Sequence, residues 1–280
     1  MKAGIITGAD GGIGQQLTRA LAKQEYSVVM GCRNIQKGNK ICEQIKQQTD
    51  WAFIEVIEID LSSFSSICRF VSDVYSKYNQ LDILLNNAGV LCHRPQMTKE
   101  NVEFTIGVNY LGHYLLTERL FPLMSSGTRI INTLSLLFRY GKIGHDFLSF
   151  NCSRFNRFRY YANSKLALYY ATLDWAEKWN KKGITVNCVD PGIVNTNIIR
   201  SGNKVIDKLC DLFFRPLIRT SQQGADTIIY LATNDEFQHV TGQLFKDRKL
   251  RQLSSLLNNQ VQRELLKQQT ENFIDKHRDY

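Results

Sequence analysis

The sequence predicts a single α/β domain, built on a doubly wound parallel sheet of about seven strands. Short apolar segments that fit buried strands alternate with segments of helical periodicity along most of the 280 residues. The first of these strands runs directly into a glycine-rich turn and a helical pattern. Only four prolines occur, and no low-complexity tract interrupts the alternation, so no linker divides the chain. A chain of this length can bury the core of one such domain.

Each strand is predicted from a short run of apolar residues bounded by glycine or polar residues. The runs that fit are 3–7, 26–31, 52–59, 81–85, 128–133, 183–188 and 242–245. Helical patterns fill most of the gaps between them, and a helix is the usual connection between neighbouring parallel strands. The predicted fold is therefore the Rossmann fold, and it occupies residues 1–246.

The turn after the first strand carries the first functional signal. It reads Gly8-Ala9-Asp10-Gly11-Gly12-Ile13-Gly14, and a helical pattern follows from Leu17. Glycines let the backbone turn tightly and approach a pyrophosphate, whose charge is favoured by the N–H groups of the following helix. The turn alone also fits an ordinary surface loop. We expect it to bind a dinucleotide through residues that include Gly8, Asp10, Gly12, Ile13 and Gly14.

A second signal lies in the stretch Tyr161-Ala162-Asn163-Ser164-Lys165. Residues four positions apart share one face of a helix, so Lys165 can act on the phenol of Tyr161. A free phenol has a pKa of about 10, and a neighbouring cation lowers that pKa. Tyr161 could then serve as a general acid and base. Tyr160 has Ser164 four positions on, so the register selects Tyr161.

The residue after the second strand distinguishes two nicotinamide cofactors in this fold. An acidic residue there accepts hydrogen bonds from a ribose 2′-hydroxyl, whereas an arginine binds a 2′-phosphate. Arg33 follows this strand, and no Asp or Glu occurs from Ser27 to Ile41. The sequence therefore predicts NADP(H), bound by Arg33 with help from Lys37. A solvated loop arginine is the alternative.

The Thr-Gly-x-x-x-Gly-x-Gly turn and the Tyr-x-x-x-Lys pair together resemble the short-chain dehydrogenase/reductase superfamily. Further motifs match in the order of that family and cover roughly residues 1–245. They are Asp60-Leu61, Asn86-Asn87-Ala88-Gly89, Asn109 within Val108–His113, Ser135 after the strand 128–133, and Asp190–Thr196. The joint order of so many motifs leaves little room for coincidence.

The resemblance implies a role for each of these residues. The cofactor would contact Asp60 and Leu61 beside its adenine. Ser135 would bind the substrate carbonyl oxygen, Lys165 the nicotinamide ribose, and Asn109 a water that connects Lys165 with solvent. The implied catalytic set is Asn109, Ser135, Tyr161 and Lys165. The remaining implied cofactor contacts, several of them against the nicotinamide, are Asn87, Ala88, Gly89, Pro191, Gly192, Val194 and Thr196, with Tyr161 and Lys165.

Two features narrow the resemblance to the retinol-dehydrogenase-like branch. Ser135 lies 26 positions before Tyr161, which is about twice the spacing of many family members. The short sequences Val108–His113 and Cys32–Asn34 also match motifs of that branch. The sequence departs from the family at Asp10-Gly11, where relatives have Asn followed by Ser or Thr. We therefore expect a side-chain hydroxyl contact to the cofactor phosphates to be missing. At Leu134 a frequent serine is also replaced, but no catalytic group is lost.

Three segments outside these motifs carry further expectations. Residues 149–159 interleave aromatic residues with arginines, which favours a flap whose phenylalanines dock on the domain while the guanidinium groups face water. Contact with nucleic acid is the alternative for this segment. Residues 198–220 are expected to form an apolar lid over a lipophilic substrate, or else to pack on the core or on a neighbouring subunit. After residue 246 a polar tail begins, and an amphipathic helix is predicted from the spacing of Leu250, Leu253, Leu257, Val261 and Leu265.

Composition limits the remaining classes of function. The net charge of +9 is spread along the chain without a recognised nucleic-acid module, which argues against nucleic acid and suits a polyanionic cofactor. Seven cysteines without Cys-x-x-Cys spacing indicate reduced thiols, with neither disulfides nor a metal site. With no leader before the first strand and no run of about 18 apolar residues, we expect a cytoplasmic protein without a transmembrane segment. A homodimer and a homotetramer both stay open.

From these observations we expect an NADP(H)-dependent oxidoreductase that transfers a hydride between nicotinamide and a lipophilic carbonyl or alcohol. The alternative is a catalytically idle protein that binds NADP(H) and acts as a sensor or scaffold. Such proteins usually lack the serine, the tyrosine or the lysine, and all three are present here.

Overall fold

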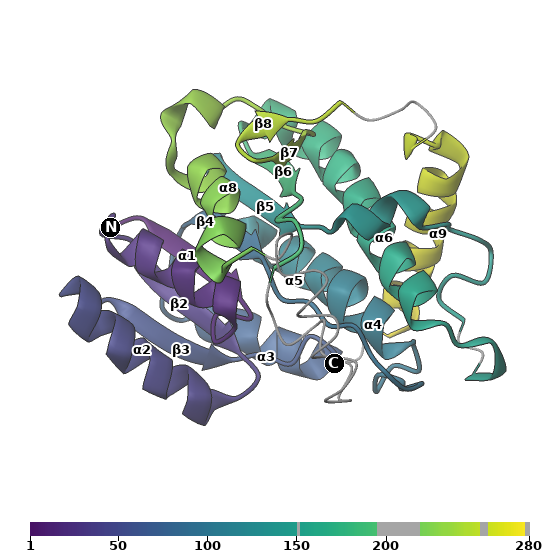
Figure 1. Ribbon diagram of the computed structural model, residues 1–280, viewed down its shortest axis with the longest axis horizontal. Coiled ribbons are helices and arrows are strands. Elements are labelled where there is room, and N and C mark those ends of the chain that lie inside the picture. Colours follow the sequence, from purple (N-terminus) through teal and green to yellow (C-terminus); the bar gives the residue numbers. More distant parts are fainter. Residues whose placement is uncertain (150–151, 195–218, 253–256, 278–280) are drawn as a thin grey trace.

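The computed structural model describes residues 1–149, 152–194, 219–252 and 257–277. The strands described form one eight-stranded sheet in the order β3-β2-β1-β4-β5-β6-β7-β8. They are β1 (Ala3–Thr7), β2 (Ser27–Cys32), β3 (Ile54–Glu58), β4 (Leu81–Asn86), β5 (Met124–Thr133), β6 (Thr185–Val189), β7 (Leu244–Lys246) and β8 (Lys249–Leu250). Neighbouring strands are parallel except for β7 and β8. Helices lie on both faces of this sheet (Figure 1), which confirms the doubly wound α/β fold.

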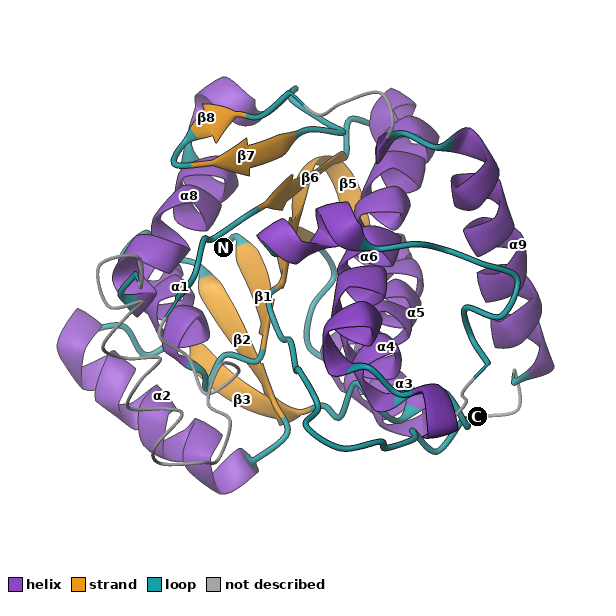
Figure 2. Cartoon of the chain, turned by 45° about the vertical axis from the view of Figure 1, so that its right-hand side comes forward, coloured by secondary structure: helices purple, strands orange, loops and turns teal. Residues whose placement is uncertain are grey.

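Two layers of helices enclose the sheet (Figure 2). One layer contains α1 (Gly12–Ala22), α2 (Ile35–Thr49) and α8 (Ser221–Thr233), and the other contains α3 (Phe64–Tyr75), α5 (Gly112–Leu120) and α6 (Arg157–Trp179). The last helix, α9 (Gln260–Lys276), packs on α6. The shorter helical segments are α4 (Phe104–Ile106), a π-helical turn (Gly107–Leu111), and 3₁₀ turns at Phe121–Leu123, Leu136–Tyr140, Cys152–Arg154, Asn180–Lys182 and Asp235–Phe237.

The central strand explains why the sequence pattern predicts this fold. All five residues of β1 are buried, because helices cover both faces of a central parallel strand. Successive side chains point to opposite faces, so Ile5 packs with the core beneath α3, α5 and α6. Ile6 packs with the core beneath α1, α2 and α8. A continuous apolar run is therefore the signature of this strand.

The seven predicted strands all occur, with their ends displaced by a few residues. The largest difference is at β5, which begins at Met124, before the start that the sequence predicts. The prediction missed the first residues of this strand because most of them are exposed and carry no apolar pattern. The eighth strand, Lys249–Leu250, was not predicted. It is two residues long and exposed, and it pairs antiparallel with β7. Such a strand forms because a partner edge is available, so the local sequence gives no sign of it.

The helix of the tail differs from its prediction in register. It begins at Gln260, whereas Leu250 lies in β8 and Leu253 lies outside the described residues. Its buried residues are Arg263, Leu266 and Thr270, while Val261 is 77% exposed. The predicted apolar face was wrong at Val261, although Leu257 packs against the core. A paired arginine and a hydrogen-bonded threonine occupy positions that the pattern assigned to the polar face. The proposed boundary at residue 247 falls in the turn between β7 and β8.

The predicted flap at 149–159 is only partly as expected, and residues 150 and 151 lie outside the described residues. The ring of Phe155 stacks on Tyr160 with centroids 5.5 Å apart, so this phenylalanine docks on the domain. Phe158, however, is 57% exposed, with the guanidinium group of Arg157 over its ring. The docking prediction was wrong for Phe158, because α6 begins at Arg157 and the residues Phe158 and Arg159 of its first turn face outward and are exposed.

Two further findings concern the chain as a whole. The six cysteines in the described part of the chain are unpaired, and Cys32, Cys42 and Cys188 among them are buried. Cys68 is only partly buried. Within the described ranges, no helix combines the length and apolarity that crossing a membrane requires.

Candidate active site

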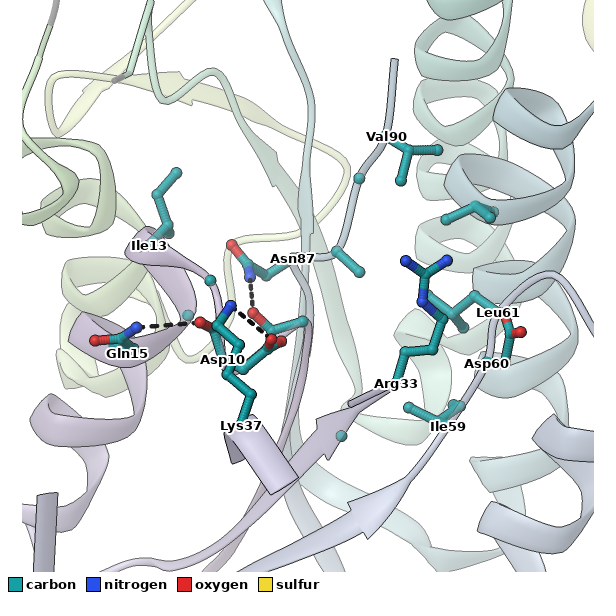
Figure 3. Close-up of a pocket in the computed structure, with 18 residues that line it drawn as sticks. Asp10, Ile13, Gln15, Arg33, Lys37, Ile59, Asp60, Leu61, Asn87 and Val90 are labelled. Atoms are coloured by element: carbon teal, nitrogen blue, oxygen red, sulfur yellow. Dashed lines mark hydrogen bonds and ion pairs between the residues drawn. The ribbon is translucent and has the colours of Figure 1, made fainter. Parts of the chain in front are cut away.

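A cavity of about 470 Å³ opens at the carboxyl ends of β1 to β4 (Figure 3). Loops that follow parallel strands meet at this edge of the sheet, which is where ligands bind in open α/β folds. Twelve of the predicted cofactor-binding residues line the cavity: Gly8, Asp10, Gly12, Ile13, Gly14, Arg33, Lys37, Asp60, Leu61, Asn87, Ala88 and Gly89. The lining residues that sequence reasoning missed are Gly11, Gln15, Gly31, Ile59, Val90 and Val108, most of them direct neighbours of predicted ones.

The glycine turn has the geometry of a phosphate cradle. Gly8 has a φ of +62°, a left-handed conformation that favours glycine. A Cβ on Gly14 would lie 2.3 Å from the carbonyl oxygen of Gly8, so a larger residue would push the turn open. No side chain caps the start of α1, whose N-cap is Gly11. The turn therefore presents backbone N–H groups and a positive helix end to an anion.

Of three charged residues that line the cavity, two form an ion pair with each other and the third does not. Lys37 pairs with Asp10, with 2.8 Å between Nζ and Oδ2, whereas Figure 3 shows the guanidinium group of Arg33 extending beside Leu61. Within the described ranges, no hydrogen bond or ion pair involves Arg33. The predicted help from Lys37 is thus reduced, because its charge is directed at Asp10.

Two polar side chains complete the lining. The Asp60 carboxylate accepts hydrogen bonds from Ser62 N and Ser62 Oγ at 2.9 and 2.6 Å, which orders the turn after β3. Asn87 donates through Nδ2 to Thr7 O at 3.0 Å, but its buried Oδ1 has no partner among the described residues. A buried acceptor without a partner is costly, so this oxygen fits a ligand that donates a hydrogen bond.

The predicted acid–base group lies on α6 beside the end of β5. Tyr161 is 8% exposed, and its phenol lies near the side chain of Ser135, which acts on its pKa. Lys165 is buried one turn further along and donates to Thr133 O at 2.7 Å. The ring of Tyr160 stacks on Phe155, while Tyr161 is the phenol whose pKa Ser135 affects.

The electrostatics of this pair differ from the prediction. Burial raises the pKa of Tyr161, while the nearby Ser135 side chain lowers it and the charge of Asp190 raises it further. Burial also lowers the pKa of Lys165 to about 7. The expected lowering of the phenol pKa by Lys165 is therefore absent here, because an ammonium group that is itself desolvated holds its charge weakly. Its Nζ lies 6.0 Å from the centre of the Tyr161 ring.

Asn109 lies in the π-helical turn between α4 and α5, and it is fully buried. Its Nδ2 donates to Val90 O at 2.9 Å and to Ser164 Oγ at 3.1 Å, and its Oδ1 accepts from Val90 N at 2.8 Å. Both amide hydrogens are thus occupied by the protein. The predicted water-holding role stays a prediction, and it rests on the remaining lone pair of Oδ1.

Gly89 connects the acid–base group with the cavity. A Cβ at this position would lie 3.5 Å from Lys165 Nζ and 3.7 Å from Asn109 Oδ1. Because Gly89 also lines the cavity, the two parts of the predicted site are contiguous. The structure thus brings together motifs that are up to 157 positions apart, from Gly8 to Lys165.

The segment predicted to face the nicotinamide is only partly described. Gly192 has a φ of +78°, and its N–H donates to the buried Asp190 at 3.0 Å. Pro191 is part of this turn, but Val194 is buried in the core against Gly224. Its side chain therefore packs in the core beneath α1, α2 and α8. Thr196 and most of the predicted lid lie outside the described residues, and the end of that prediction, Thr220, caps α8.

Comparison with known proteins identifies the family. The model of a family described as short chain dehydrogenase matches residues 2–206, well over half of the chain. The chain belongs to the short-chain dehydrogenase family. It is an oxidoreductase of this family, whose members typically use a nicotinamide cofactor and act on small molecules.

The curated relatives agree with the branch expected from the sequence. Human retinol dehydrogenase 12 is 34% identical over 253 residues, which cover 89% of this chain and 78% of that protein. Human retinol dehydrogenase 14 is 33% identical over 269 residues, covering 90% of this chain and 80% of its own. The predicted resemblance to the retinol-dehydrogenase-like branch is confirmed.

Solved structures with lower identity share the fold. An uncharacterized protein from Mycobacterium paratuberculosis matches with a TM-score of 0.79 and 23% identity, covering 98% of this chain and 94% of its own. A short chain dehydrogenase from Burkholderia cenocepacia in complex with NADP matches with a TM-score of 0.70 and 22% identity, covering 88% and 95%. At these identities the match supports the architecture alone.

Proposed function

We propose that the protein is an NADP(H)-dependent oxidoreductase that transfers a hydride between nicotinamide and a carbonyl or alcohol carbon of a lipophilic small molecule. The observation that carries the proposal is the contiguity of two parts of the site. Lys165, one helical turn after Tyr161, lies next to Gly89, which lines the glycine-rich cavity. An acid–base group beside a dinucleotide cradle fits hydride transfer to a carbonyl.

The residues present fit NADP(H). The glycine turn and the uncapped start of α1 would hold the pyrophosphate. Arg33 would bind the 2′-phosphate, because its guanidinium group has no partner among the described residues. Asn87 Oδ1 offers an unpaired buried acceptor. The relative from Burkholderia cenocepacia, whose structure contains NADP, is consistent with this choice. When bound, the nicotinamide supplies or accepts the hydride.

The side chains of this protein would carry the proton chemistry. Tyr161 donates a proton to the substrate oxygen in reduction and removes it in oxidation. The Ser135 hydroxyl donates a hydrogen bond to the same oxygen and stabilises the charge that develops on it. Lys165 would bind the ribose hydroxyls, and the negative phosphates nearby would favour its charged form.

A lipophilic substrate is supported by the surroundings of Ser135. Leu136 follows it directly and is 44% exposed. Exposed apolar side chains beside polar catalytic groups gain free energy when a substrate covers them. The curated relatives are named retinol dehydrogenases, after a lipophilic alcohol.

The test is a screen of lipophilic aldehydes, ketones and alcohols, followed through NADPH absorbance. In the variant Tyr161→Phe, turnover should be abolished while NADPH still binds, because only the acidic proton is lost. Tyr160→Phe is the matched control, and it should keep its turnover because Ser164, and not a lysine, lies four positions after Tyr160.

Near-normal turnover in Tyr161→Phe would exclude this mechanism. Loss of turnover only in Tyr160→Phe would show that Tyr160, and not Tyr161, is the acid. If the wild-type protein binds NADPH but turns over no compound in the screen, the sensor or scaffold alternative is favoured.

A further inference from the structure

His113 is a buried titratable residue that the proposed chemistry does not use. It lies on α5, four residues after Asn109, and its exposure is 0%. Its Nε2 lies 2.9 Å from Thr7 Oγ1, and its Nδ1 lies 3.2 Å from the backbone oxygen of Asn109. Each ring nitrogen therefore has a partner, and the two partners belong to different parts of the site.

The partners determine which nitrogen carries the proton. A backbone carbonyl can only accept a hydrogen bond, so Nδ1 must donate to Asn109 O. In a neutral imidazole the other nitrogen is then an acceptor, so Nε2 receives the hydroxyl proton of Thr7. The other acceptor available to that hydroxyl, Leu85 O, is more distant at 3.4 Å.

The same assignment satisfies the oxygen of Thr7. Its lone pairs accept the backbone N–H groups of Asn87 and Ala88, at 2.9 and 3.0 Å. Hydrogen bonds therefore run in one direction, from these two N–H groups through Thr7 and His113 to the carbonyl of Asn109. Reversing the ring tautomer would leave Nδ1 as an acceptor facing a carbonyl oxygen, which is repulsive.

We propose that His113, held as the Nδ1–H tautomer, is a positioning residue that fixes the helix of Asn109 relative to the end of β1 and the Asn87–Ala88 backbone. This role rests on the proposed function, because it ties the acid–base side of that site to the lining of its cofactor cavity. His113 itself is fully buried and is not among the residues that line the cavity.

The environment keeps this ring neutral. Burial lowers the pKa of His113 to about 3, the hydrogen bond to Asn109 opposes this effect, and the charge of Lys165 lowers the pKa further. The other groups that face the ring, Thr7 and Asn109, carry no charge. A neutral ring is what the hydrogen-bond chain requires, since an imidazolium could not accept from Thr7.

The tautomer can be measured directly on the wild-type protein. Long-range ¹H–¹⁵N spectra of protein labelled at its five histidines distinguish the two neutral tautomers and the imidazolium. The His113 signals are assigned from their disappearance in His113→Asn. We expect Nδ1–H at neutral pH. An Nε2–H ring or an imidazolium would overturn the proposal, whether or not a substrate is ever found.

Two variants separate the contacts of the ring. His113→Asn places an amide donor where Nδ1 was and keeps the contact with Asn109, while His113→Gln reaches toward Thr7 and keeps that contact. In His113→Gln we expect kcat to fall by about tenfold or more, with the NADPH dissociation constant within about twofold of wild type. In His113→Asn we expect the reverse, with weaker NADPH binding and a smaller change in kcat.

The control is His145→Gln, because His145 is exposed. Thermal unfolding shows whether each variant is folded under the assay conditions. If the folded variants change both parameters equally, or change stability alone, the positioning role is wrong. If the NADPH titrations separate as expected but no turnover is found in any protein, the proposed enzyme function fails while the coupling through Thr7 stands.

Discussion

Arg33 and Lys37 line the same cavity, yet their charges are available to a ligand to different degrees. Lys37 is paired with Asp10, and the two side chains are 50% and 19% exposed. Such a half-exposed pair adds little stability, but it places a carboxylate and an ammonium group together, so their combined charge is close to zero. Arg33 has no such partner within the described ranges. Arg33 is therefore the residue that we expect to bind a 2′-phosphate.

Replacing Arg33 by Asp should weaken NADPH binding strongly and NADH binding little. The change removes a charged hydrogen bond of about 1.5–3 kcal/mol and adds a repulsive charge. The measurement is a fluorescence titration with each cofactor, and Lys37→Met serves as the control with a smaller preference change. Equal losses for both cofactors would mean that Arg33 does not contact the phosphate.

Lys165 carries an electrostatic cost because its ammonium group is buried. Its folded pKa is about 7, below its ordinary value of 10.5, because burial opposes the charge. Below about pH 7 the lysine is protonated in both states, so the full cost of burying a charge is present. As the pH rises toward 10.5 the folded state loses the proton first, and this cost is relieved.

The variant Lys165→Met should therefore alter stability in a pH-dependent way. The difference in Tm between the variant and the wild type should be most favourable to the variant at about pH 6 and should decline toward about pH 9. Both proteins are measured without cofactor, which keeps ligand linkage out of the comparison. A difference that stays constant over this range would contradict the low pKa of Lys165.

At the scale of elements, α9 connects the end of the chain with the acid–base side of the site. Arg263 forms ion pairs with Asp174 and Glu177 on α6. Thr270 is joined to Tyr110 through their hydroxyls at 2.7 Å. Gln262 accepts from the backbone N–H of Ile143 at 2.7 Å, in the loop that follows Ser135. The helix therefore supports α6 and this loop together.

Removing the buried arginine should destabilise the domain. Arg263→Met leaves Asp174 without its cation, and we expect a loss of about 1–3 kcal/mol in the free energy of unfolding, measured in urea. The control is Lys178→Met, also on a pair involving α6, but with a lysine that is 56% exposed. Its loss should stay below about 1 kcal/mol. If both variants lose the same amount, burial of Arg263 does not matter.

For the whole molecule, the cavity is formed by turns that follow four different strands, β1 to β4. A ligand that touches all four turns binds only the folded chain, so it should stabilise the entire domain. NADPH at about one hundred times its dissociation constant should add about 2.7 kcal/mol to the free energy of unfolding. Thermal unfolding at increasing NADPH measures this effect, and Arg33→Asp should reduce it. No shift in Tm at any concentration would contradict NADPH binding.

Local signals made the fold and the cofactor cavity predictable. Buried parallel strands require continuous apolar runs, and a tight turn beside a phosphate requires glycine, so both constraints are visible in short stretches such as 3–7 and Gly8–Gly14. The pair Tyr161 and Lys165 was predictable for a similar reason, because two residues four positions apart lie on the same face of a helix. By contrast, β8, the buried face of α9 and the exposure of Phe158 were missed, because each depends on what a distant segment offers to the residue.

Periodicity and the chemistry of neighbouring residues were enough to predict the element order, the family motifs and the residue types of the site. The electrostatics of the site, in contrast, arise from the folded chain. It pairs Lys37 with Asp10, desolvates Lys165 and raises the pKa of Tyr161 through burial. It also joins His113 to Thr7 across 106 positions. The physical reason is that desolvation and long-range hydrogen bonds depend on which groups surround an atom in space, and spacing along the chain does not fix that.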